Sequence, residues 1–85
     1  MQYLIMCRSL TNAQRASAFL ERKGISASVI KAPQYLSTGG CAYALSLYKH
    51  FYEASVLLKN SNLLSGKRFV RLENGEFSEV RDDIS

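Results

Sequence analysis

The residues best suited to chemistry lie in one short segment, Ser37-Thr38-Gly39-Gly40-Cys41. Two glycines before a cysteine let the backbone adopt positive φ angles and turn its N–H groups toward one point, where they can hold an anion or a thiolate. The thiolate is the nucleophilic form of cysteine. The spacing therefore suggests a nucleophilic or sulfur-carrying Cys41. The same residues also fit a plain turn before a small buried cysteine.

Cys7 is the second cysteine of the chain. It could act as a resolving thiol that attacks an adduct on Cys41 and closes a disulfide, or it could pack against the neighbouring strand. His50 is the single histidine, so we expect neither a His-rich metal site nor a Ser-His-Asp relay within one chain. Two cysteines and one histidine are also too few for a closed four-ligand zinc site. We therefore expect no metal and no cofactor.

Length and composition limit the classes of function. The 85 residues, 47% of them hydrophobic, predict one small domain at residues 1–80, followed by an acidic tail at residues 81–85 that we expect to be disordered. No apolar run approaches the ~20 residues of a membrane-spanning helix, and the first residues lack a basic leader, so we expect a cytoplasmic protein with reduced thiols and no membrane contact. A domain of this size favours a carrier over a stand-alone enzyme.

Charge is distributed unevenly along the chain. Residues 1–72 contain ten Lys or Arg and two acidic residues, a balance of +8, whereas residues 73–85 contain one Arg and five acidic residues, a balance of −4. A small basic body can attract nucleic acid, anionic small molecules or an acidic protein. The acidic residues 73–85 could fold back and weaken the positive potential of residues 1–72.

Hydrophobic periodicity and turn residues predict the elements that position Cys41. Strands are expected at residues 2–7, 25–31, 41–47, 67–72 and 76–80. One helix follows a capping box formed by Thr11 and Gln14 and stops at Gly24, and a second helix covers residues 48–60. The Asn74-Gly75 pair predicts a two-residue hairpin turn that places residue 72 opposite residue 77.

This order predicts an α+β fold: a ferredoxin-like βαββαβ sandwich with an antiparallel sheet, two helices on one face and an extra C-terminal hairpin strand. The strand that ends at Cys7 and the strand that begins at Cys41 are then antiparallel neighbours, with both thiols at one end of the sheet. Arg8, Lys67, Arg68 and the N-terminus of the first helix reach the same end. Because cations and a helix dipole lower the pKa of a cysteine, we expect the pKa of Cys41 to lie below the usual ~8.5.

The sheet face away from the helices raises two alternatives. We expect it to hold some of the side chains of Tyr3, Ile5, Tyr43 and Phe69, an apolar surface that a second copy could cover to give a homodimer. RNA-recognition domains share this topology and stack bases on sheet aromatics, and residues 67–72 have a related basic and aromatic sequence. A non-enzymatic binding or assembly module, RNA-binding proteins included, is therefore the alternative to a thiol carrier.

The sequence resembles the small selenium/sulfur carrier-like proteins in two features. One is a predicted strand–helix–strand that starts near residue 3. The other is the order that follows it: Pro33, then the Leu36-Ser37 pair, then Cys41 at the start of a strand of small residues. The resemblance covers roughly residues 2–60. It implies a ferredoxin-like fold and a Cys41 that accepts sulfane sulfur or selenium, as a persulfide or selenopersulfide, and hands it to a partner. The implied partners are sulfur or selenium donor and acceptor proteins such as a cysteine desulfurase.

Overall fold

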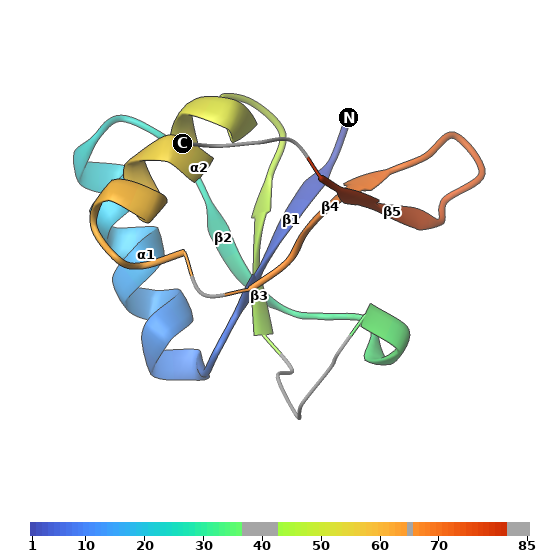
Figure 1. Ribbon diagram of the computed structural model, residues 1–85, viewed down its shortest axis with the longest axis horizontal. Coiled ribbons are helices and arrows are strands. Elements are labelled where there is room, and N and C mark those ends of the chain that lie inside the picture. The colour runs from blue at the N-terminus through green and yellow to red at the C-terminus, as the bar shows by residue number, and fades with distance from the viewer. Residues whose placement is uncertain (37–42, 65, 82–85) are drawn as a thin grey trace.

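The computed structural model describes residues 1–36, 43–64 and 66–81. These residues form strands β1 (Tyr3–Cys7), β2 (Ser28–Lys31), β3 (Tyr43–Leu47), β4 (Arg68–Arg71) and β5 (Phe77–Val80). The helices are α1 (Leu10–Arg22) and α2 (Phe51–Asn60), and a short 3-10 turn, η1, covers Gln34–Leu36. The predicted α+β class is confirmed (Figure 1).

The five strands form one antiparallel sheet in the order β2-β3-β1-β4-β5. Strands β1 and β3 are neighbours in this sheet. β1 ends at Cys7, β3 begins two residues after Cys41 in the sequence, and Cys7 lies opposite Tyr43. The hairpin strand β5 forms one edge of the sheet and β2 forms the other. The antiparallel sheet is therefore as predicted, whereas the ferredoxin-like assignment stays a prediction.

Both helices pack on the same face of the sheet (Figure 1). Their buried residues join Ile5, Leu45 and Leu47 of the central strands in one apolar cluster. The helix residues in this cluster are Ala13, Ala16 and Leu20 from α1 and Phe51, Ala54 and Leu58 from α2. Because full burial of one large aliphatic side chain contributes about 1.5–3 kcal/mol, this cluster is a main source of the stability of the fold.

Residues 32–36, which follow β2 and include η1, pack against the opposite face of the sheet. Leu4, Met6 and Phe69 lie on this face and are buried. Ala32 and Leu36 pack against them and are also buried. The sheet therefore has an apolar cluster on each side, and the central strand β1 contributes alternate side chains to both.

The predicted assignment of side chains to this second face is wrong for Tyr3, Ile5 and Tyr43. All three belong to or pack against the helix-covered cluster, and the ring of Tyr3 stacks on Phe51 with 4.3 Å between centroids. Phe69 does lie on the second face, but it is buried. Alternation along a strand shows which residues share a face and not which face receives the helices. These residues therefore do not form the surface expected for a second copy or for RNA bases.

The start of α1 also differs from the prediction. The helix begins at Leu10, because the side chain of Ser9 accepts a hydrogen bond from the Asn12 amide at 3.1 Å and serves as the N-cap. Thr11, the expected capping residue, lies inside the first turn. The helix thus begins about one half-turn earlier than the pattern of Thr11 and Gln14 predicts.

The two helices end in the same geometry. After α1, the amides of Gly24 and Ile25 donate to the carbonyls of Glu21 and Leu20 at 3.0 and 2.9 Å, and Gly24 has a positive φ of 82°. This is the Schellman arrangement, and it confirms the predicted stop at Gly24. Asn62 takes the corresponding place after α2, with a φ of 59°.

The β4–β5 hairpin has a different register from the predicted one. Arg71 lies opposite Phe77, and the amide of Leu72 donates to the carbonyl of Glu76 at 2.7 Å. The connection is therefore a three-residue loop, residues 73–75, which ends at Gly75 with a φ of 88°. The two-residue turn predicted from Asn74-Gly75 is wrong by one residue.

Candidate functional site

The candidate site lies at the end of the sheet where β1 ends, α1 begins and β3 begins, which we call the cysteine end (Figure 1). Cys7 lies opposite Tyr43, and Cys41 precedes Tyr43 by two residues in the sequence. Cys41 and residues 37–40 lie outside the described residues, so their predicted roles stay predictions. The described residues nearby define the surroundings into which this segment enters.

Cys7 is part of the core. Its side chain is 1% exposed and belongs to the helix-covered apolar cluster. Its thiol donates a hydrogen bond to the carbonyl of Ile5 at 3.5 Å, a distance within the range for sulfur. A thiol in this position contributes to packing, and an external reagent has no direct access to it.

The N-terminus of α1 opens at the cysteine end, as the sequence predicts. Ser9 and Asn12 cap it, and the Arg8 amide donates to Asn12 Oδ1 at 3.4 Å. The first turn contains no acidic residue that would offset the partial positive charge of the helix terminus. Negative charge at this end of the sheet is therefore stabilised by the helix dipole.

Two predicted cations are also found at the cysteine end. Arg8 directly follows Cys7 and is exposed. The Lys67 carbonyl accepts a hydrogen bond from the Met6 amide at 2.8 Å, which holds the start of β4 next to the end of β1. The Lys67 ammonium lies 3.8 Å from the carboxylate of Glu79, so part of its charge is balanced.

Arg68, the third predicted cation, is placed differently. Its side chain is buried, at 7% exposure. Its guanidinium carbon lies 5.4 Å from the centre of the Phe51 ring, in a cation–π contact with the first residue of α2. Because Phe51 stacks on Tyr3, at the start of β1, the charge of Arg68 is directed away from the cysteine end.

Lys31 is a cation at the cysteine end that the sequence analysis did not select. It lies opposite Tyr43 on β2, and Tyr43 in turn lies opposite Cys7, so the three residues form one row across the sheet. Lys31 is exposed. Lys31 ends the second predicted strand, which lies next to the strand that follows Cys41. This place in the sequence could have identified Lys31 as a cation of the cysteine end.

Gly66 fixes the approach of the chain to this end of the sheet. A Cβ atom at this position would lie 2.6 Å from the Met6 carbonyl oxygen, closer than real Cβ contacts allow. Only glycine lets the backbone at residue 66 come this close to Met6. The next residue, Lys67, accepts the hydrogen bond from the Met6 amide. The sequence did not reveal this constraint, because it depends on a long-range contact.

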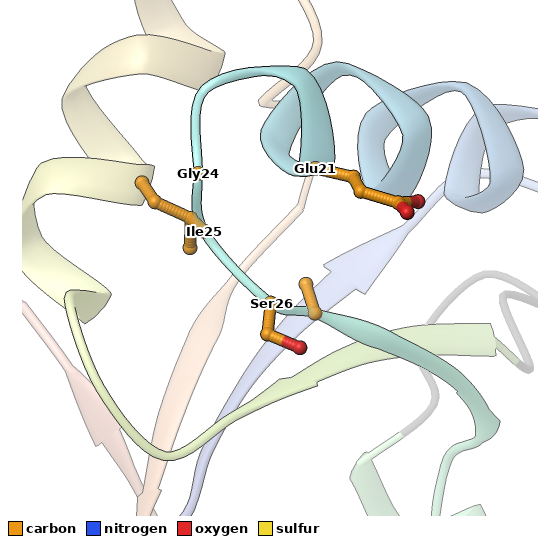
Figure 2. A pocket seen from close by; sticks show the side chains of 5 residues that line it. Glu21, Gly24, Ile25 and Ser26 are labelled. Carbon is orange, nitrogen blue, oxygen red and sulfur yellow. The ribbon is translucent and has the colours of Figure 1, made fainter.

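The opposite end of the sheet, which we call the histidine end, is hollowed. One hollow is lined by residues 21 and 24–27, where the chain passes from α1 into β2 (Figure 2). Two others are lined by residues from the connection between β3 and α2, Tyr48, Lys49 and His50 among them. His50 has a φ of 58° and its Nδ1 lies 3.5 Å from Glu53, where both side chains are exposed.

α2 begins at Phe51, three residues later than predicted, because His50 adopts this left-handed conformation just before it. Among residues 1–36, 43–64 and 66–81, no three His, Cys, Asp or Glu side chains are grouped so that they could hold a metal ion. Within the same residues, neither helix has the length and apolar character needed to cross a membrane.

Comparison with known proteins gives one match. Residues 2–65 match the model of a family described as "Putative Se/S carrier protein-like". This confirms the resemblance seen in the sequence, and the matched segment includes Cys7, Cys41 and the elements from β1 to α2. No curated protein and no solved structure matches the chain.

Proposed function

The chain belongs to the Se/S carrier protein-like family, and we propose that it carries sulfur or selenium on Cys41 between two partner proteins. The observation that carries this proposal is the family match over a segment that contains Cys41. The two partners are a donor protein that holds a persulfide, such as a cysteine desulfurase, and an acceptor protein with its own thiol.

The transfer is a thiol–disulfide type of exchange. The Cys41 thiolate attacks the outer sulfur of the donor's persulfide, a new S–S bond forms at Cys41, and the donor's S–S bond breaks. The donor cysteine leaves as a thiolate. Handing the outer sulfur to an acceptor thiolate repeats the same step, so the cycle needs no separate oxidant or reductant. Selenium would follow the same course as a selenopersulfide.

The surroundings described at the cysteine end support a thiolate there. Tyr43 begins β3 at this end, and Cys41 precedes it by two residues in the sequence. The N-terminus of α1, with Arg8 and Lys31, contributes positive potential, and such potential favours the ionised form of a cysteine. We expect these groups to lower the pKa of Cys41 below its usual value.

Cys7 has a supporting role in this proposal. Because its side chain is buried in the helix-covered cluster, a resolving role would require local opening of the fold. We assign it to packing, with Cys41 as the one acceptor. A persulfide carrier needs reduced thiols, and we therefore propose that the protein works in the cytoplasm.

Mass spectrometry tests the proposal directly. The protein is incubated with a cysteine desulfurase and cysteine, and we expect a mass gain of one sulfur atom on the peptide that contains Cys41. Cys41→Ser should lose this gain completely, since a hydroxyl cannot form a persulfide. Repeating the reaction with a selenium donor shows which element is preferred.

Cys7→Ala is the matched control. It removes the other thiol and should still load one sulfur atom on Cys41, provided that circular dichroism shows the variant to be folded. Loading on Cys7, or equal loading in Cys41→Ser, would contradict the assignment.

A further inference from the structure

The outer surface of α1 carries arginines for which residues 1–36, 43–64 and 66–81 show no ion-pair partner. Arg15 and Arg22 are exposed and lie two turns apart, about 10 Å along the helix axis. Ala18 is exposed between them, Thr11 is exposed one turn before Arg15, and Arg8 is exposed just before the helix. We call these five residues the arginine ridge.

The charge of the ridge is not balanced within the described part of the chain. No ion pair there involves Arg8, Arg15 or Arg22. By contrast, Lys67 and Arg81 both lie within 3.8 Å of Glu79. Glu21 is the one acidic residue of α1. A row of uncompensated guanidinium groups attracts an anionic surface from solution.

The ridge runs directly from the cysteine end. Arg8 follows Cys7, and α1 begins beside the start of β3, at the lower edge of the view in Figure 1. A partner that contacts Arg8, Arg15 and Arg22 would therefore have one end of its contact surface next to the segment that enters β3. This is where the proposed exchange takes place.

We propose that the arginine ridge docks an acidic surface of the protein that loads Cys41. This inference rests on the proposed carrier function and names the chemistry of its partner. Guanidinium groups recognise carboxylates through paired hydrogen bonds, and the small side chains of Thr11 and Ala18 let a partner approach the helix backbone closely. The ridge lacks the exposed aromatic side chains on which single-stranded RNA stacks, which favours a protein as occupant.

The test separates docking from chemistry. Binding of a cysteine desulfurase is measured by titration calorimetry in a Cys41→Ser background, where no sulfur can be transferred. Adding Arg15→Glu and Arg22→Glu should weaken binding at least about tenfold, because attraction becomes repulsion at two contacts. Raising the salt concentration should weaken the binding of the ridge-bearing protein, since exposed charge pairs are screened.

The matched control is Lys49→Glu with Lys59→Glu. Both lysines are exposed and lie off the ridge, and the pair makes the same change in net charge. We expect less than about a twofold change in binding. Equal weakening by both pairs would show an effect of net charge alone, and no binding to the desulfurase would also overturn the proposal.

Two further readouts distinguish the remaining outcomes. Loading of Cys41 by inorganic polysulfide needs no docking, so Arg15→Glu with Arg22→Glu should leave its rate unchanged at high salt, where attraction of the polysulfide anion to the ridge is screened. Failure of polysulfide and desulfurase alike to load the unmodified protein would contradict the carrier function, while calorimetry still decides the docking. Binding of a single-stranded RNA that is lost in the ridge variant, with desulfurase binding unchanged, would assign the ridge to nucleic acid and overturn the proposal.

Discussion

The two ends of the sheet start their helices in opposite ways. At the cysteine end, Ser9 has an extended backbone and its side chain accepts a hydrogen bond from the Asn12 amide, so α1 begins with a satisfied cap. At the histidine end, His50 has a left-handed backbone with a φ of 58° and makes no side-chain capping hydrogen bond to α2. One helix start is thus locally stabilised, and the other is held by tertiary packing.

The two ends also differ in the side chains that are described around each helix start. At the histidine end, residues 21, 24–27 and 48–53 contribute to the lining of hollows, and Tyr48 and Tyr52 are exposed there. The cysteine end has a capped helix N-terminus, with Arg8 and Lys31 exposed nearby. The comparison teaches that the two helix starts differ both in how their backbone is stabilised and in the side chains exposed around them.

The largest effect should separate the two cysteines. We expect iodoacetamide to modify Cys41 at least about 100-fold faster than Cys7, because Cys7 becomes reachable only when the core opens. Peptide mapping by mass spectrometry after timed quenching measures both rates. Equal rates in the folded protein would remove the distinction between an acceptor and a packing thiol.

The next effect concerns the close approach at the cysteine end. Gly66→Ala should lower the free energy of unfolding by about 2 kcal/mol, because the new methyl group would overlap the Met6 carbonyl. Gly24→Ala is the comparison: its Cβ meets no atom within 4 Å, so only the strained φ counts, at about 1 kcal/mol. Urea unfolding measures both, and a harmless Gly66→Ala would mean that β4 is not held as described.

A smaller effect tests the cap of α1. Ser9→Ala should lower the free energy of unfolding by about 1 kcal/mol, since it removes the acceptor for the Asn12 amide. Thr11→Ala should change it by less than about 0.5 kcal/mol, because Thr11 lies inside the first turn and is exposed. The reverse order of the two effects in urea unfolding would restore the capping box predicted from Thr11 and Gln14.

The smallest effect should have the opposite sign at the other helix start. His50→Gly should raise the free energy of unfolding by about 0.5 kcal/mol, because glycine adopts a φ of 58° without strain and no capping hydrogen bond is lost. Thermal unfolding with Ser9→Gly as the matched change checks this. If His50→Gly destabilises the protein as Ser9→Gly does, the two helix starts are equivalent and the comparison above fails.

Local patterns predicted the elements well and their long-range details poorly. The stop at Gly24 could be predicted because the Schellman geometry depends on a few neighbouring residues. The start of α1 was misplaced because Ser9 and Thr11, only two residues apart, are both good capping residues, and only packing decides between them. The hairpin register was missed because Asn74-Gly75 fits loops of two and of three residues.

The candidate site shows the same limit. The pairing of β1 with β3 followed from the order of elements, and with it the meeting of Cys7, Arg8 and the N-terminus of α1 at one end. The direction of the Arg68 side chain could not be predicted, because it depends on its contact with Phe51 across the core. Lys31 became apparent only when the strand register placed it opposite Tyr43.

The pairing of β1 with β4 bears on where this domain can be cut. The family match ends at residue 65, whereas β4 begins at Arg68 and lies against the central strand β1. A fragment trimmed to the matched segment would leave one side of β1 without its hydrogen-bonding neighbour, next to the buried side chains of Leu4 and Met6. An unprotected strand of this kind recruits strands from other copies and promotes aggregation. The hairpin outside the family match therefore covers the edge of β1 that such a fragment would expose.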